Sequence, residues 1–230
     1  MRIQFLGHSA FLVEGSKTLL FDPYLTDNPK ATVTPYDLHP DFILVSHGHG
    51  DHFGDALEIA RANDATIIAP NELALYCGRR GVDAHPMHIG GKQRFAEDLV
   101  VKLTVAHHGS ALIEEGLSQY LGAPCGFLVY MDGKTLYFAG DTALTYDMKA
   151  CIGDLNDIDV AMLPIGDNYT MGPDDAAVAV DWLDPRIVIP MHYDTFPLIK
   201  QDVSAFQKEV EGKHPDKKVF ALQPGEIFEF

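Results

Sequence analysis

The segment Ser46–His52, which reads Ser-His-Gly-His-Gly-Asp-His, constrains this chain more than any other stretch. It places three imidazoles and one carboxylate within six residues, and these side chains bind zinc, manganese or iron at neutral pH. A shuffled chain of this composition contains His-x-His-x-Asp-His in only about 0.2 % of cases. The alternative is histidines that serve local hydrogen bonds, but such crowding costs desolvation and repulsion unless a cation is present. The segment therefore predicts a metal centre.

The overall composition limits the classes of partner. With 230 residues, 47 % of them hydrophobic, the chain can form one large core, and we expect a single domain over residues 1–230. A net charge of −16 argues against a long nucleic-acid tract as ligand, although bound dications would hold one phosphate. The sequence contains no apolar run of membrane-spanning length and no signal-peptide pattern, and its three scattered cysteines indicate no disulfide framework. We therefore expect a cytoplasmic protein with a small-molecule substrate, and self-association stays open.

Short apolar runs bounded by turn residues predict a chain rich in strands. Asp132-Gly133 marks a hairpin turn. We expect helices over 55–62, over 71–76 with Asn71 as cap, over 173–182 and over 203–211, and loops over 25–41 and around His85 and His88. The rhythm of strands and helices in each half predicts an α/β protein with two facing sheets and outer helices, a four-layer αββα sandwich. The predicted strands are 3–6, 11–14, 18–21, 42–45, 66–69, 99–105, 127–130, 135–138, 160–163, 186–189, 219–222 and 227–228.

Residues that can bind metal follow the ends of predicted strands. This happens at four places, each time directly after an apolar strand. If these ends gather at one edge of the two sheets, the side chains converge on a single site, where strand ends hold them rigidly. The four residues are His47, His108, Asp141 and His192.

On these residues, together with Gly140-Asp141-Thr142, the chain resembles the metallo-β-lactamase superfamily over nearly its whole length. Within that superfamily it is most similar to a widespread group of metal-dependent hydrolases. The runs Leu6–Ser9, Pro164–Pro173 and Pro190–Tyr193 carry this second resemblance. The group is related more distantly to ascorbate-phosphate lactonase and to the phospholipase D that cleaves N-acyl phosphatidylethanolamines.

The resemblance implies two divalent metal ions, with Zn²⁺ as the first expectation and Mn²⁺ or Fe²⁺ as alternatives. Asp141 would bridge the two ions. Geometry agrees with such a division, since side chains two apart on an extended segment point the same way, while Asp51 and His52 can turn toward a second ion. The first ion would be held by His47, His49 and His108, and the second by Asp51, His52 and His192.

Three further residues are expected in the second shell or the pocket wall. His107 and His108 both follow a strand, and the family pattern selects His108, the residue before Gly109-Ser110, as the ligand. His107 would then line the wall. In the superfamily an early aspartate, here Asp22, orients a ligand histidine. His8 is expected either to line the pocket or to have a purely structural role.

The resemblance implies hydrolysis of an ester, lactone or phosphoester of a small molecule by a hydroxide bridging the metals, with Asp51 and Asp141 as the catalytic carboxylates. The alternatives are a phosphodiesterase or nuclease of the same fold, a di-iron oxidoreductase, and a metal-binding module without turnover. A di-iron protein would usually carry a flavin domain, which this sequence lacks. Seven matching ligand positions argue against a module without turnover.

Overall fold

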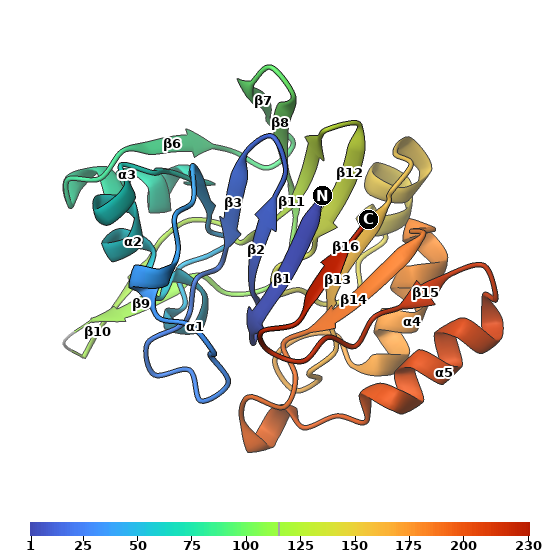
Figure 1. Ribbon diagram of the computed structural model, residues 1–230. Helices are drawn as coiled ribbons and strands as arrows, with labels where there is room; N and C mark the ends of the chain where they lie inside the picture. Colours follow the sequence, from blue (N-terminus) through green and yellow to red (C-terminus); the bar gives the residue numbers. More distant parts are fainter. Residues whose placement is uncertain (115) are drawn as a thin grey trace.

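The protein was analysed as a computed structural model that describes residues 1–114 and 116–230. Seven strands form the first sheet, in the order β16-β1-β2-β3-β4-β5-β6 (Figure 1). The chain ends in this sheet, because β16 pairs antiparallel with β1. The bounds are β1 (Arg2–Gly7), β2 (Ala10–Glu14), β3 (Thr18–Phe21), β4 (Phe42–Leu44), β5 (Thr66–Pro70), β6 (Ala84–Met87) and β16 (Ile227–Glu229).

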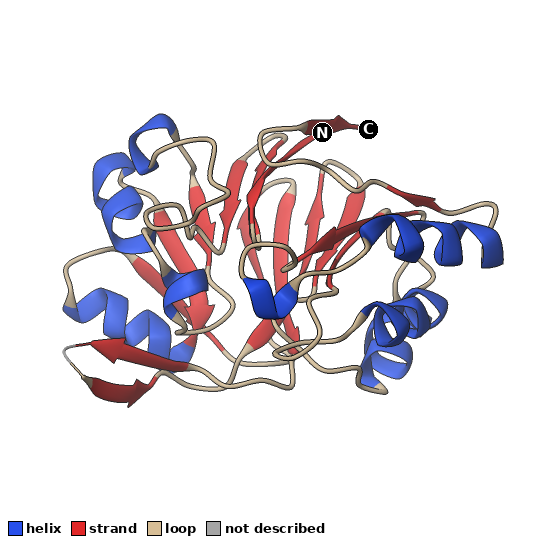
Figure 2. Ribbon diagram, turned by 90° about the horizontal axis from the view of Figure 1, so that it is seen from below, coloured by secondary structure: helices blue, strands red, loops and turns tan. Residues whose placement is uncertain are grey.

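Seven more strands form the second sheet, in the order β15-β14-β13-β12-β11-β8-β7, and two make a separate antiparallel pair. The bounds in the second sheet are β7 (Lys92–Ala96), β8 (Leu99–Val105), β11 (Cys125–Met131), β12 (Lys134–Phe138), β13 (Val160–Pro164), β14 (Ile187–Met191) and β15 (Lys218–Val219). The separate pair is β9 (Ala111–Glu114) and β10 (Leu117–Tyr120), which projects from the body of the molecule (Figures 1 and 2).

Helices cover the outer faces of both sheets, which confirms the four-layer sandwich (Figure 2). The first sheet is covered by α2 and α3, and the second by α4 and α5. Short 3₁₀ segments span Pro35–Asp37, Gly153–Leu155 and Pro197–Ile199, and a π-helical turn spans Met148–Ile152. The α-helices are α1 (Gly50–Phe53), α2 (Ala56–Asn63), α3 (Asn71–Arg79), α4 (Pro173–Leu183) and α5 (Val203–Lys213).

Alternation along the strands divides the apolar side chains between two cores. In β3, Leu19 and Phe21 point into the space between the sheets, while Leu20 points toward α2 and α3. Successive side chains of a strand face opposite sides, so one strand serves both layers. Phe21 packs against Phe138 of the second sheet with ring centroids 5.0 Å apart, which joins the sheets face to face.

Several expectations needed correction. The residue at the cap position of α3 is Pro70, and Asn71 is already helical, so Asn71 is not the cap. Residues 84–87 around His85 are an edge strand rather than a loop, because they pair in parallel with β5. The expected strand 219–222 shrinks to Lys218–Val219, where the chain leaves β14.

The strand directions decide where the functional side chains lie. β3 and β4 run parallel, as do β12, β13 and β14, and β8 shares their direction because β11 is antiparallel to both β8 and β12. Their carboxyl ends therefore share one edge of the sandwich, where open sheets place their ligand sites. Among the described residues, no helix is both long enough and apolar enough to cross a membrane.

Candidate metal centre

Five strands each end in a polar residue at this shared edge. Asp22 follows β3 directly, His192 follows β14 directly, and each of the other three comes three positions after the last residue of its strand. The motif itself changes conformation as it runs: His49 is extended at the cap position of α1, and Asp51 and His52 lie inside that single helical turn. The polar residues at the five strand ends are Asp22, His47, His108, Asp141 and His192.

Three imidazoles form the first group. Nε2 of His47 lies 3.0 Å from Nδ1 of His49, and Nε2 of His108 lies 3.2 Å from that same Nδ1. One ring nitrogen from each residue can therefore face a common point, since the three nitrogens all lie within 4.8 Å of one another. His47 is fully buried, whereas His49 and His108 are only partly covered and form the accessible side of the group.

Asp141 joins this group to a second one. Its Oδ2 atom lies 3.1 Å from Nε2 of His192, 3.3 Å from Nε2 of His52 and 3.4 Å from Nε2 of His108. A single carboxylate oxygen is thus shared by imidazoles from α1 and from the ends of β8 and β14. Asp141 is buried, with Gly140 before it at φ +62°, a left-handed conformation that glycine adopts without steric cost.

Asp22 and Ser46 contact two histidine rings on the side that faces away from the centre. Nδ1 of His52 donates to Oδ2 of Asp22 at 2.7 Å, and the hydroxyl of Ser46 donates to the same oxygen at 2.6 Å. The Ser46 hydroxyl also lies 2.8 Å from Nδ1 of His47. Such contacts fix the ring orientation and leave the Nε2 atoms to face the centre. Asp22 was expected to contact a ligand histidine, whereas Ser46 was missed; its place at the head of the motif was the available signal.

The second group also includes His8 and Asp51. Nε2 of His8 lies 3.2 Å from Oδ2 of Asp51, and a ligand atom from each of His8, Asp51, His52 and His192 fits within 4.8 Å. The backbone N–H of His192 donates to the carbonyl of His8 at 2.7 Å, which links the two sheets at the centre. His8 at φ +59° and His192 at φ +57° are both left-handed, a costly conformation for these residues that often marks functional sites.

Burial and charge give the imidazoles of the centre different protonation states. Burial lowers the pKa of His47 well below its usual value and lowers the pKa of His8 to about 4, so both rings are neutral at pH 7. Burial disfavours the charged form of His52 as well, but Asp141 and Asp22 face its two nitrogens and raise its pKa well above the usual value.

The carboxylates of Asp141 and Asp51 stay charged. Burial raises the pKa of Asp141, but the neighbouring His192 and His52 rings outweigh burial and hold the pKa well below its usual range. For Asp51, the hydrogen bond with His8 and the field of His52 likewise outweigh burial and lower the pKa. The centre therefore offers the negative oxygens of Asp51 and Asp141 beside imidazole nitrogens, and carboxylate with imidazole is the donor set of a transition-metal site.

Orphaned polar atoms provide a test of whether these residues fit a metal. Among the described residues, Nε2 of His52 and Oδ1 of Asp141 are buried without a hydrogen-bond partner. Buried polar atoms normally have partners, and exceptions call for an explanation such as an ion. Both atoms belong to the cluster, so the residues present fit the divalent ions that the sequence implied.

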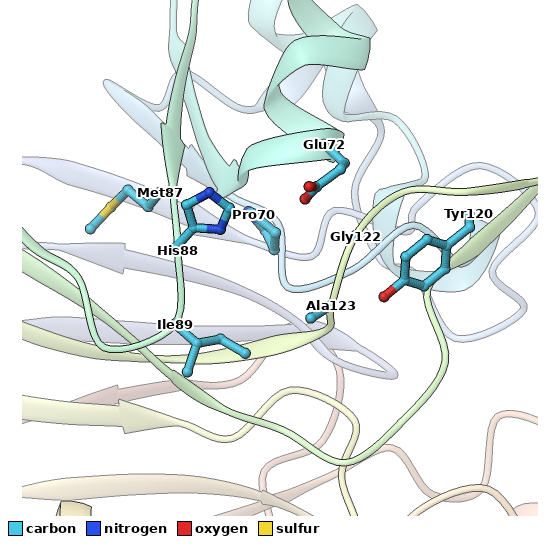
Figure 3. Close-up of a pocket in the computed structure, with 8 residues that line it drawn as sticks. All are labelled: Pro70, Glu72, Met87, His88, Ile89, Tyr120, Gly122 and Ala123. Atoms are coloured by element: carbon cyan, nitrogen blue, oxygen red, sulfur yellow. The ribbon is translucent and has the colours of Figure 1, made fainter.

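The remaining histidines lie outside the cluster. His107 is exposed: its backbone N–H binds Oγ1 of Thr142, while the ring of the adjacent His108 faces Asp141. His88 lines a separate cavity of about 410 Å³ together with Glu72 and Tyr120 (Figure 3). Leu121, between two residues that line that cavity, takes up the space that a side chain at Gly48 of the motif would need. The cavity therefore neighbours the centre, but no predicted ligand lines it.

Comparison with known proteins identifies the family. A family model described as "Beta-lactamase superfamily domain" matches residues 17–193. The chain belongs to the β-lactamase superfamily. It is 56 % identical to a metal-dependent hydrolase of Desulforamulus reducens, with 99 % of each chain covered, and 50 % identical to a metal-dependent hydrolase of Pelotomaculum thermopropionicum, with 100 % of each covered. These relatives confirm the expected enzyme class, a metal-dependent hydrolase of this superfamily.

Solved structures agree with this family membership. Igni18, a metallo hydrolase from the archaeon Ignicoccus hospitalis, is 37 % identical with a TM-score of 0.90, and the match covers 100 % of this chain and 98 % of Igni18. An isothiocyanate hydrolase from Delia radicum gut bacteria matches at 21 % identity and a TM-score of 0.78, covering 100 % of this chain and 99 % of that enzyme. The second likeness extends to the fold alone. Together they confirm the metallo-β-lactamase fold predicted from the sequence.

Proposed function

We propose that the chain is a single-domain dinuclear metal hydrolase acting on a small ester, lactone or phosphoester that carries an anionic group. The observation that carries this proposal is the position of Asp141, whose Oδ2 atom lies 3.1–3.4 Å from Nε2 of His192, His52 and His108. A carboxylate between two sets of imidazoles is what a bridge between two cations requires, because its charge offsets their repulsion.

The ligand assignment follows the two groups. His47, His49 and His108 would hold one ion, Asp51, His52 and His192 would hold the other, and Asp141 would bridge them. An imidazole-rich set with carboxylates suits Zn²⁺, our first choice, and also accommodates Mn²⁺ or Fe²⁺. When bound, two such ions would supply Lewis acidity and lower the pKa of a coordinated water toward 7.

The chain's own residues would orient the metal-binding rings and the attacking water. Asp22 and Ser46 fix the rings of His52 and His47 through their Nδ1 atoms. The side chain of Asp51 is 33 % exposed, more than the buried Asp141, so Asp51 stands where a substrate enters. Asp51 would also help to orient the attacking water. No serine or cysteine nucleophile is needed for this chemistry.

A recess beside the centre supports an anionic substrate. It has a volume of about 490 Å³ and is lined by Lys30 and Lys200 as well as by Asp194, Thr195 and Phe196. Neither lysine forms an ion pair within the described part of the chain, so both charges are available to a ligand. The Phe196 ring lies 5.5 Å from the His8 ring, so the recess borders the cluster. Two free ammonium groups at that position would bind a phosphate or carboxylate.

A substrate screen tests this proposal. Purified protein loaded with Zn²⁺ or Mn²⁺ is offered lactones, phosphorylated lactones, phosphomonoesters, phosphodiesters and short nucleic acids, with Asp141→Asn protein as the blank. We expect turnover of an anionic small molecule that chelation abolishes and that the variant lacks. Equal rates for Asp141→Asn and the parent would rule out the proposed centre, and a preference for nucleic acid would move the substrate class to nucleases.

A further inference from the structure

We propose that His8 is a positioning residue: its buried ring, held by Thr195, aims the carboxylate of Asp51 at the metal centre. This inference rests on the proposed function for its catalytic consequence. Its geometry stands on two contacts, because Nδ1 of His8 lies 2.9 Å from Oγ1 of Thr195 and Nε2 lies 3.2 Å from Oδ2 of Asp51.

The proton positions follow from which groups can donate. A charged carboxylate only accepts, whereas a threonine hydroxyl both donates and accepts. A neutral imidazole carries one N–H, so a favourable contact with Asp51 needs that proton on Nε2. Nδ1 is then an acceptor, and the hydroxyl of Thr195 donates to it. Asp51 therefore fixes the tautomer of His8, and Thr195 supports it by donating to Nδ1 at 2.9 Å, a shorter contact than the 3.4 Å from its hydroxyl to the carbonyl of Tyr193.

The ring is fixed by more than these two contacts. His8 is 1 % exposed and Thr195 is 7 % exposed, so water does not compete for either hydrogen bond. The His8 ring lies 4.2 Å from the His192 ring, and the carbonyl of His8 accepts from the N–H of His192. His8 therefore sets the position of one predicted ligand through its side chain and of another through its backbone.

The arrangement repeats on the other side of the centre with the roles reversed. There a carboxylate, Asp22, orients an imidazole, His52, and Ser46 supplies the hydroxyl. Here an imidazole, His8, orients a carboxylate, Asp51, and Thr195 supplies the hydroxyl. In both cases the outer group contacts the atom that is not needed for the metal, which leaves Oδ1 of Asp51 free for a cation.

Direct ligation by His8 is the competing interpretation, because its ring can share a 4.8 Å cluster with Asp51, His52 and His192. We favour positioning because Nε2 of His8 faces Asp51. The Nε2 atoms of His52 and His192 instead face Oδ2 of Asp141, the oxygen that joins the two groups. The two roles differ in what a glutamine at position 8 does. Its amide N–H₂ can still donate to Asp51, but an amide is a poor zinc ligand, so glutamine restores positioning and not ligation.

The experiment compares His8→Ala, His8→Gln, Thr195→Val and Thr195→Ser with the parent. Zinc stoichiometry, zinc affinity by chelator competition and the visible spectrum of the Co²⁺-substituted protein give readouts independent of turnover. Hydrolysis of p-nitrophenyl acetate and bis(p-nitrophenyl) phosphate gives kcat and KM. Thermal unfolding of each variant shows that the compared proteins are folded.

If His8 positions Asp51, His8→Ala lowers kcat and metal affinity by about 10- to 100-fold, as the loss of such outer contacts does, with little change in KM. His8→Gln recovers most of this loss. The kcat and metal affinity of Thr195→Val fall between those of His8→Ala and the parent, and those of Thr195→Ser match the parent. The double variant His8→Ala/Thr195→Val loses no more than His8→Ala alone, because Thr195 acts through His8.

Three results would overturn the inference. If His8→Gln loses one metal equivalent as His8→Ala does, His8 is a ligand. If Thr195→Val matches the parent while His8→Ala is impaired, the hydroxyl of Thr195 does not hold the ring and His8 acts without it. If His8→Ala binds zinc and shifts the Co²⁺ spectrum no differently from the parent, it has no role at Asp51. If the parent hydrolyses neither probe, the proposed function is in doubt, yet the metal readouts still decide the role of His8.

Discussion

Asp22 and His52 are joined by a 2.7 Å hydrogen bond between two fully buried groups, from Nδ1 of the imidazole to Oδ2 of the carboxylate. The contact links the end of β3 to α1 and places the opposite ring nitrogen, Nε2, 3.3 Å from Asp141. A buried carboxylate behind a ligand histidine raises its basicity and fixes its ring, so the bond couples the first sheet to the metal centre.

The first prediction concerns this contact. Asp22→Asn removes the charge that supports His52 while keeping the shape, and we expect zinc affinity and kcat to fall by about 10- to 100-fold. Chelator competition and steady-state kinetics measure the two losses. Asp55→Asn is the matched control, because Asp55 is buried and, within residues 1–114 and 116–230, its side chain accepts only from the backbone N–H groups of Leu25 and Thr26. Unchanged zinc affinity in Asp22→Asn would show that the bond does not support the centre.

A second prediction concerns metal removal. The centre gathers buried imidazoles and carboxylates, so the metal-free protein should unfold at a lower temperature than the loaded one. Saturation at about 1,000 times Kd stabilises a protein by about 4 kcal/mol, and at about 2–4 °C per kcal/mol for a chain of this size the melting temperature rises by about 10 °C. Calorimetry before and after chelation measures this shift.

Zn²⁺ or Mn²⁺ should restore the melting temperature, whereas Mg²⁺, which prefers oxygen ligands, should not. A colourless, active, reloaded protein would fit zinc, and a visible absorption band in the purified protein would point to iron. Equal melting temperatures with and without zinc would contradict a cation held by these residues.

The third prediction addresses the recess between Lys30 and Lys200. Replacing either by alanine removes one exposed positive charge, and we expect KM for an anionic ester to rise by about 2- to 5-fold, in line with exposed ion pairs. KM for a neutral ester of the same acyl group should not change. Added salt should raise the KM of the parent toward that of the variants, because salt screens the attraction between the lysines and the anionic ester.

Lys208→Ala is the control for this series, since Lys208 is exposed on α5 and does not line the recess. If Lys208→Ala raises KM as much as Lys30→Ala or Lys200→Ala does, the effect comes from net charge and the recess has no part in substrate binding.

The fourth prediction concerns pH and stability far from the centre. Burial raises the pKa of Asp159, but the N–H of Thr135 and the ammonium of Lys134 outweigh burial and lower it. A lowered pKa in the folded state adds stability that is present above the unfolded value of about 3.9 and is lost as the pH falls through the folded value.

Asp159→Asn should therefore cost about 1–3 kcal/mol of unfolding free energy at pH 7, and the difference from the parent should shrink below pH 4. Urea titrations at both pH values measure the two differences. Zinc affinity should stay as in the parent, because Asp159 does not contact the cluster. A cost that grows on acidification would have the wrong sign for this mechanism.

The fold class could be predicted from the sequence pattern, because that prediction needs only local information. Consecutive apolar residues such as Leu19, Leu20 and Phe21 show that a strand is covered on both faces. Asp132-Gly133 marks another hairpin without knowledge of any distant residue. The metal site could be predicted from the motif at Ser46–His52 for the same reason, because the spacing of its histidines and aspartate lies within one segment. The edge strand β6 was missed because Pro86 and its polar neighbours resemble a loop until β5 pairs with them.

Tertiary structure alone decided which polar groups meet. His8 and Thr195 are 187 positions apart, and nothing near either residue in the chain predicts their contact. The family pattern favoured His108 over His107, although both follow the same strand. The packing of the two sheets is the physical reason, because it turns the His108 ring toward Asp141 and leaves His107 exposed. Periodicity reports which face of an element is covered; the pairing of strands and the packing of sheets fix what covers it, and a binding site consists of those contacts.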